Sequence, residues 1–85
     1  MAFELYSDVI LTRDVDEHNL RVGDVGTVVA RHVVPGMGEE GYSVEFFDMI
    51  GNTVAVLTVP ANSLRLPTPM DRPAVRARSA LRSRI

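Results

Sequence analysis

The sequence predicts an all-β fold, a small antiparallel barrel of five strands followed by a separate C-terminal tail. Five short segments are rich in β-branched residues or alternate apolar with polar residues, which is typical of strands. Turn-forming residues separate these segments, and no convincing helical pattern occurs before residue 70. Because 85 residues provide only one core, we assign residues 1–70 to the barrel and residues 71–85 to the tail.

The first half of the barrel contains two predicted strands. Residues 8–13 form a run rich in β-branched side chains and predict the first strand, and the polar residues 14–19 predict a loop. After a glycine-containing turn, the second strand is expected from Gly26 to about residue 34. Residues 35–41 contain three glycines and one proline, so we expect a flexible hairpin connection there.

The second half contains three predicted strands. Residues 42–46 alternate apolar with polar residues, and residues 53–59 follow the Gly51-Asn52 turn as a fourth strand. Residues 60–63 are expected to form one helical turn before a short last strand at 64–66, an ending that resembles that of SH3-like barrels. The expected core consists of Val9, Leu11, Val28, Ala30, Val44, Phe46, Val54, Val56 and Leu64.

The stretch LRVGDVGTVVARH, residues 20–32, contains a Gly-Asp-x-Gly-x-Val turn similar to the KOW-type element of ribosomal and transcription-elongation proteins. Gly23 and Gly26 have the freedom to adopt positive φ, and the Asp24 side chain can accept hydrogen bonds from nearby amides. Nucleic-acid contact in such elements comes from the surrounding basic and aromatic residues, whereas Arg21 and Arg31 stand here among many acids. We therefore interpret Gly23, Asp24 and Gly26 as a structural turn.

The composition argues against several classes of chemistry. The chain has no cysteine, and neither a membrane-length apolar run nor a secretion signal is present, so we expect a cytoplasmic protein without membrane association. The two histidines, His18 and His32, accompany no nucleophile elbow and no phosphate-binding loop. The acids beside His18, Asp14 to Glu17, are more typical of a solvated loop than of a metal site. We expect no catalytic residue, no cofactor and no metal.

The charge is divided unevenly along the chain. Residues 1–70 hold four arginines and ten acids, a net charge of −6, whereas residues 71–85 hold five arginines and one acid, a net charge of +4. The acidic charge of residues 1–70 favours a basic protein partner. Phe47 follows Phe46 and so breaks the alternation of its strand; it is either an exposed contact residue or a residue that covers one end of the barrel. The candidate protein-binding residues are Asp14, Asp16, Glu17, Glu39, Glu40, Phe47 and Asp48.

The tail carries two further possibilities. Four apolar residues of the tail recur every three or four positions: Ala74, Ala77, Leu81 and Ile85. The tail is therefore either a solvated, frayed terminus or a short helix that docks on a partner or on the barrel. Its basic side chains offer phosphate contacts, which gives nucleic-acid binding as an alternative function. The arginines concerned are Arg72, Arg76, Arg78, Arg82 and Arg84.

Three stretches, DVILTRDVDEHNLRVGDVGTVV, GYSVEFFD and NTVAVLTVPANSLR, resemble a family of small bacterial proteins classed as a domain of unknown function. The resemblance covers roughly residues 8–66, although members usually carry proline where Asp16 stands. The family's toxin- or nuclease-like neighbours imply an antitoxin- or immunity-like role with the product of an adjacent gene as partner. No functional residues follow from the resemblance. An accessory docking subunit of a larger enzyme complex is a third possibility, which rests on fold similarity alone.

Overall fold

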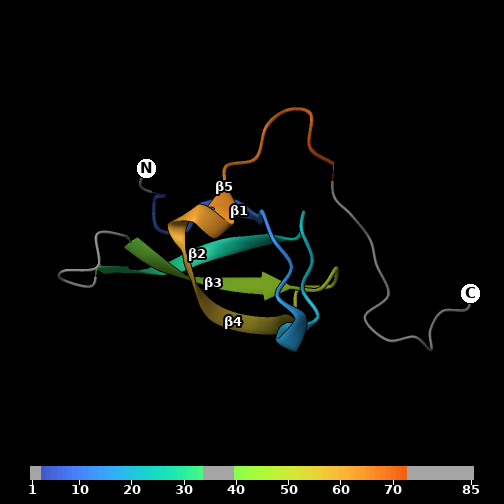
Figure 1. Ribbon diagram of the computed structural model, residues 1–85. Coiled ribbons are helices and arrows are strands. Elements are labelled where there is room, and N and C mark those ends of the chain that lie inside the picture. The colour runs from blue at the N-terminus through green and yellow to red at the C-terminus, as the bar shows by residue number, and fades with distance from the viewer. Residues whose placement is uncertain (1–2, 34–39, 73–85) are drawn as a thin grey trace, which may run out of the picture.

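The computed structural model describes residues 3–33 and 40–72, and within them the chain is all-β (Figure 1). The two 3₁₀ turns among these residues are η1 (Asp16–His18) and η2 (Ala61–Ser63). The strands are β1 (Asp8–Leu11), β2 (Val25–Val33), β3 (Glu40–Phe47), β4 (Thr53–Pro60) and β5 (Leu64–Arg65). The predicted fold class is therefore confirmed, and η2 lies where one helical turn was predicted.

All five strands belong to one antiparallel sheet in the order β4-β3-β2-β1-β5. The chain runs as a meander from β1 to β4, and η2 then leads it back so that Leu64 of β5 pairs with Leu11 of β1 (Figure 1). The sheet is bent but not closed, because β4 and β5 remain its two edges within the described residues. Closure into a barrel, which the sequence pattern predicted, is therefore not found.

The core lies on the inner face of the bent sheet. Six of the predicted core residues are buried there: Val9, Leu11, Val28, Val44, Phe46 and Leu64. The cluster also contains four residues that the sequence pattern did not single out, namely Phe3, Leu20, Tyr42 and Val59. Phe3 and Leu20 lie outside the predicted strands, and Val59 ends a predicted strand that is apolar on both faces. Tyr42 lies on the same face of the alternating segment 42–46 as Val44 and Phe46.

The prediction that Ala30 belongs to the core is wrong because β2 contains a β-bulge. The pairing with β3 shifts between Val28 and Ala30, so that Ala30 lies opposite Ser43 rather than on the inner face. A bulge adds one residue to its strand and reverses the inward and outward positions beyond it. Arg31, opposite the buried Tyr42, thereby takes the inner face that Ala30 was predicted to occupy.

The predicted inward positions of β4 are also wrong. The residues of β4 that pack against the core are Ala55 and Leu57, and the latter lies opposite the buried Val44 of β3. Val54 is only half-buried and Val56 is 54% exposed on the outer face. Because β4 is apolar on both faces, its own periodicity could not choose between them, and the register with β3 makes that choice.

The structure confirms a turn at Gly23 and gives Gly26 a different role. Gly23 has φ of 96°, and the Asp24 carboxylate accepts a hydrogen bond from the Arg21 N–H at 2.9 Å. Gly26 instead lies inside β2, where a Cβ atom would stand 2.5 Å from Val44 Cγ1. The sequence predicted that Gly26 is needed for a positive φ. The structure shows instead that Gly26 is needed for close packing of β2 against β3.

The described residues after β5 are tied back to the sheet. The Arg65 guanidinium donates to both Asp71 carboxylate oxygens, at 2.8 and 3.0 Å, and Thr68 donates its N–H and hydroxyl to the same carboxylate. These donors, the Arg65 guanidinium first, hold the pKa of Asp71 well below its usual range. No helix within the described ranges has the length and apolar character needed to cross a membrane.

Candidate functional site

The acidic loop before β2 uses part of its charge internally. Asp14 Oδ1 accepts a hydrogen bond from the Val22 N–H at 2.9 Å, so this predicted contact residue shapes the loop backbone. Asp16 forms an ion pair with Arg21 at 2.8 Å and keeps most of its side chain in solvent. Glu17 is exposed in η1. The loop therefore presents Asp16 and Glu17 outward, at the end of the sheet where β2 begins.

Asp48, another predicted contact residue, organises the turn between β3 and β4. Its Oδ1 accepts hydrogen bonds from the N–H groups of Ile50 and Asn52, at 3.0 and 2.9 Å. Gly51, with φ of 90°, donates its N–H to the Asp48 carbonyl at 3.1 Å. These bonds fix the turn, so the side chains of residues 49 and 50 project from a defined backbone.

The large apolar side chains exposed at this end of the sheet include Val25, Phe47, Met49 and Ile50. We call these residues the apolar patch. Phe47 is 44% exposed, and one further step of the β2–β3 register brings Val25 opposite it on the outer face. Met49 and Ile50, in the turn, are 73% and 84% exposed. Grouped exposure of this kind is typical of interaction surfaces, whereas single exposed apolar residues are ordinary.

The predicted residues included Phe47 and Asp48 but not Met49 and Ile50. The sequence does contain a feature that points to them, because Met49 and Ile50 are two consecutive large apolar residues between the turn residues Asp48 and Gly51-Asn52. Residues inside a tight turn project into solvent, so large apolar side chains there require a reason other than core packing.

Glu40 contributes to a hydrogen-bond network at the opposite end of β3. The Tyr42 hydroxyl donates to Glu40 Oε1 at 2.6 Å, and the Arg31 guanidinium donates to Oε2 at 2.7 and 2.9 Å. The bond from Tyr42 is the main reason why the pKa of Glu40 is lowered, and Arg31 adds to it. Burial, followed by the bond to Glu40, raises the pKa of Tyr42. This network connects β2 to β3 beyond the core.

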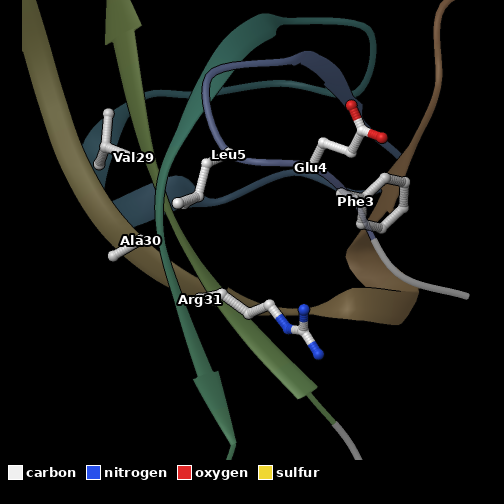
Figure 2. A pocket seen from close by; sticks show the side chains of 6 residues that line it. All are labelled: Phe3, Glu4, Leu5, Val29, Ala30 and Arg31. Atoms are coloured by element: carbon white, nitrogen blue, oxygen red, sulfur yellow. The ribbon is translucent and has the colours of Figure 1, made fainter.

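The same network anchors the N-terminal segment. The Phe3 N–H donates to the Tyr42 hydroxyl at 3.0 Å, and the two rings meet edge to face with their centroids 5.3 Å apart. Between this segment and the bulged part of β2 lies a hollow of about 560 Å³ (Figure 2). It is lined by Phe3, Glu4, Leu5, Val29, Ala30 and Arg31. Figure 2 shows the Glu4 carboxylate directed away from the middle of this hollow, which leaves Arg31 as its charged group.

Each of the arginines that the structure describes makes a contact within the chain. Arg21, Arg31 and Arg65 each form an ion pair with a carboxylate of the chain, and the Arg13 Nε donates to the Ser63 hydroxyl. Ion pairing leaves less positive potential for a phosphate group. Of the predicted tail arginines, Arg72 donates to backbone carbonyls. The others, Arg76, Arg78, Arg82 and Arg84, lie outside the described residues, as does Glu39.

Among the described residues, the hydrogen bond that a histidine side chain makes is the contact of His32 with Ser43, on the surface. The His32 Nε2 and the Ser43 hydroxyl lie 2.8 Å apart, and Ser43 shares a further hydrogen bond of 2.9 Å with Thr58. These side chains lie on the exposed outer face of the sheet, where water has access to them. His18, in η1, is exposed. Within residues 3–33 and 40–72, no group of three or more histidine, aspartate or glutamate side chains could hold a metal ion.

Comparison with known proteins identifies the family of this chain. Neither the curated proteins nor the solved structures contain a match to it. One family model, described as Domain of unknown function (DUF4926), matches residues 5–66. This range begins before β1 and ends directly after β5, so it includes the whole sheet and the apolar patch. The chain is therefore a member of the DUF4926 family.

Proposed function

We propose that this protein is a non-enzymatic binding module that contacts another protein through the apolar patch. The observation that carries the proposal is the turn of residues 48–52, which is held by hydrogen bonds and yet directs Met49 and Ile50 into solvent. A preorganised turn loses little conformational entropy when a partner covers it. Phe47 and Val25 extend the apolar surface from the turn onto the sheet.

Electrostatics favour a basic partner for this surface. Asp16 and Glu17 lie in the loop that enters β2, at the same end of the sheet as the apolar patch. The net charge of −6 over residues 1–70 attracts a basic protein and accelerates its encounter with the module. A toxin- or nuclease-like protein encoded by an adjacent gene has the expected chemistry, because nucleases bind phosphate through basic surfaces. The module would then act as an antitoxin- or immunity-like protein.

The test measures binding of the intact chain to the purified product of an adjacent gene by titration calorimetry. We expect a double variant, Met49→Ser with Ile50→Ser, to weaken binding by about tenfold or more, because both substitutions remove exposed contact area without changing the core. The matched control is Met70→Ser, since Met70 is similarly exposed (82%) but lies in the segment after β5. We expect this control to change affinity by less than about twofold.

Two results would contradict the proposal. One is equal weakening by the double variant and by the Met70 control, which would show that the patch is not the contact surface. The other is an intact chain that binds no adjacent gene product at low salt, where charge attraction is strongest. Binding to single-stranded RNA that is lost when residues 73–85 are removed would instead support the tail as a nucleic-acid site.

A further inference from the structure

Within residues 3–33 and 40–72, β4 is a long sheet edge with little protection. It has eight residues, Thr53–Pro60, none of them charged, and in the described part of the chain it pairs with β3 alone. The other edge, β5, has only two residues. Proteins usually protect a long edge strand with lysine, proline, a bulge or a covering segment, because free N–H and C=O groups recruit another strand. Here a register shift near Val54 and the proline at residue 60 leave residues 55–59 unprotected.

Pro60 indicates which backbone groups of β4 point outward. Pro60 lies opposite Gly41 in the β3–β4 pairing and has no N–H to donate, so this pair does not require a hydrogen bond to β3. In antiparallel pairing, hydrogen-bonded and non-hydrogen-bonded pairs alternate. The N–H and C=O groups of Thr58 and Val56 therefore point away from β3, toward the open edge, while those of Leu57 point toward β3.

The core is also incomplete along this edge. Ala55 and Leu57 face inward and pack against the core cluster, but both remain partly exposed, whereas their neighbours Val44 and Phe46 in β3 are buried. An additional strand beside β4 would cover these side chains and extend the inner face by one layer. Small domains bury only a modest fraction of their surface, so such additional burial has a large relative effect on their stability.

We propose that the partner of this edge is a second copy of the chain, joined by antiparallel pairing of β4 with β4 across a twofold axis. A twofold interface requires a self-complementary surface. Centring the pairing on Leu57 aligns the register shift near Val54 in one copy with Pro60 in the other, so the whole unprotected stretch is used. Val56 then lies opposite Thr58 of the second copy, and each such pair exchanges hydrogen bonds through its outward backbone groups.

The side chains fit this register. On the inner face, Leu57 meets its own copy, and the small Ala55 meets the larger Val59. On the outer face, Val56 meets Thr58, and no charged side chain lies opposite another in the stretch. The two copies form one continuous sheet of ten strands, twice the five of one chain. The apolar patch lies in β2, β3 and the β3–β4 turn, outside the paired stretch of residues 55–59.

The experiment uses two double variants of the intact chain that differ only in the sign of one charge. In Val56→Lys with Thr58→Lys, the register places lysine opposite lysine at both symmetric positions. In Val56→Lys with Thr58→Glu, it places lysine opposite glutamate at the same positions. The lysine introduced at position 56 lies opposite Glu45 of β3 within each chain in both variants, so that contact is matched. Sedimentation velocity measures the mass, which is 9.4 kDa for one chain.

We expect the wild-type chain and the lysine–glutamate variant to sediment at twice the mass of one chain. We expect the lysine–lysine variant to dissociate with a dimer constant weaker by about tenfold or more, since two like-charge pairs form instead of two opposite-charge pairs. Net charge alone would favour association of the lysine–lysine variant, because its net charge is zero, from the wild-type −2 plus 2, and two neutral chains do not repel each other. Circular dichroism verifies that both variants are folded. A wild-type chain that is still monomeric at about 0.1 mM, or equal association of the two variants, overturns the proposal.

Discussion

Adding one methyl group at Gly26 is expected to destabilise this protein strongly, although Gly26 lies in a strand and its φ is not positive. A Cβ atom at this position would stand 2.5 Å from Val44 Cγ1 and 2.8 Å from the Phe46 ring. Both neighbours are themselves buried in the core and have little room to move. The substitution Gly26→Ala therefore forces β2 away from β3 or displaces the Phe46 ring.

The cost follows from the overlap. Carbon atoms pack at roughly 3.5–4.0 Å, so two core side chains must each shift by about 1 Å. Inserting a methyl group into a well-packed core typically costs about 1–3 kcal/mol. For a domain of this size each kcal/mol lowers the melting temperature by roughly 4–8 °C, so we expect a decrease of roughly 4–24 °C.

Thermal unfolding followed by circular dichroism measures this change, and Gly41→Ala is the matched control. Gly41 also lies in a strand, but a Cβ atom there would have its nearest neighbour at 3.6 Å, an ordinary contact. The control is expected to be neutral or to stabilise by up to about 1 kcal/mol, because alanine restricts the unfolded chain. If the two variants melt within about 2 °C of each other, a margin of roughly half a kcal/mol, the close packing at Gly26 is not a constraint.

Three further predictions concern the polar contacts. Tyr42→Phe should lower the free energy of unfolding in urea by about 1–3 kcal/mol, because it leaves the Phe3 N–H without its acceptor and Glu40 Oε1 without its donor. An unchanged unfolding midpoint would contradict this prediction. Because the folded-state pKa of Glu40 lies below its ordinary value of 4.5, the stability that Glu40 contributes is present above pH 4.5 and is lost as the pH falls through the folded pKa. Acid titration should therefore destabilise the wild type more than Glu40→Gln, and parallel curves would exclude this contribution. Asp71→Asn should accelerate hydrogen exchange of the Thr68 amide, which donates to Asp71 at 2.6 Å, while the exchange of core amides stays unchanged.

Much of the fold could be predicted from local patterns. The strand of residues 42–46 alternates clearly because one face is buried and the other is not, and the structure extends it to β3 without changing its inward residues. Turn chemistry located Gly23 and the Gly51-Asn52 turn correctly, because positive φ strongly favours glycine. β1 is shorter than the predicted strand of residues 8–13 and ends at Leu11, where the chain leaves the sheet.

The candidate site was less predictable, since the role of a carboxylate depends on which donors surround it. Asp14 and Asp48 have the same sequence character as Asp16, yet they bind backbone amides while Asp16 remains largely in solvent. Such contacts join residues whose spacing in the sequence has no fixed pattern. Glu40 is tied to Arg31 and Tyr42 only because the β2–β3 register aligns them.

The sequence by itself determined the fold class, the five strands and the turns, because alternation, β-branching and turn residues act over a few neighbouring positions. Only the tertiary structure decided which face of β4 is buried, that Ala30 turns outward after a bulge, and that Gly26 lies against Val44. Each of these depends on the pairing of strands far apart in the sequence, and a shift of one residue exchanges the two faces of a strand. The position of β4 at an edge of the sheet, among the residues that the structure describes, likewise follows from strand order, which no local pattern contains.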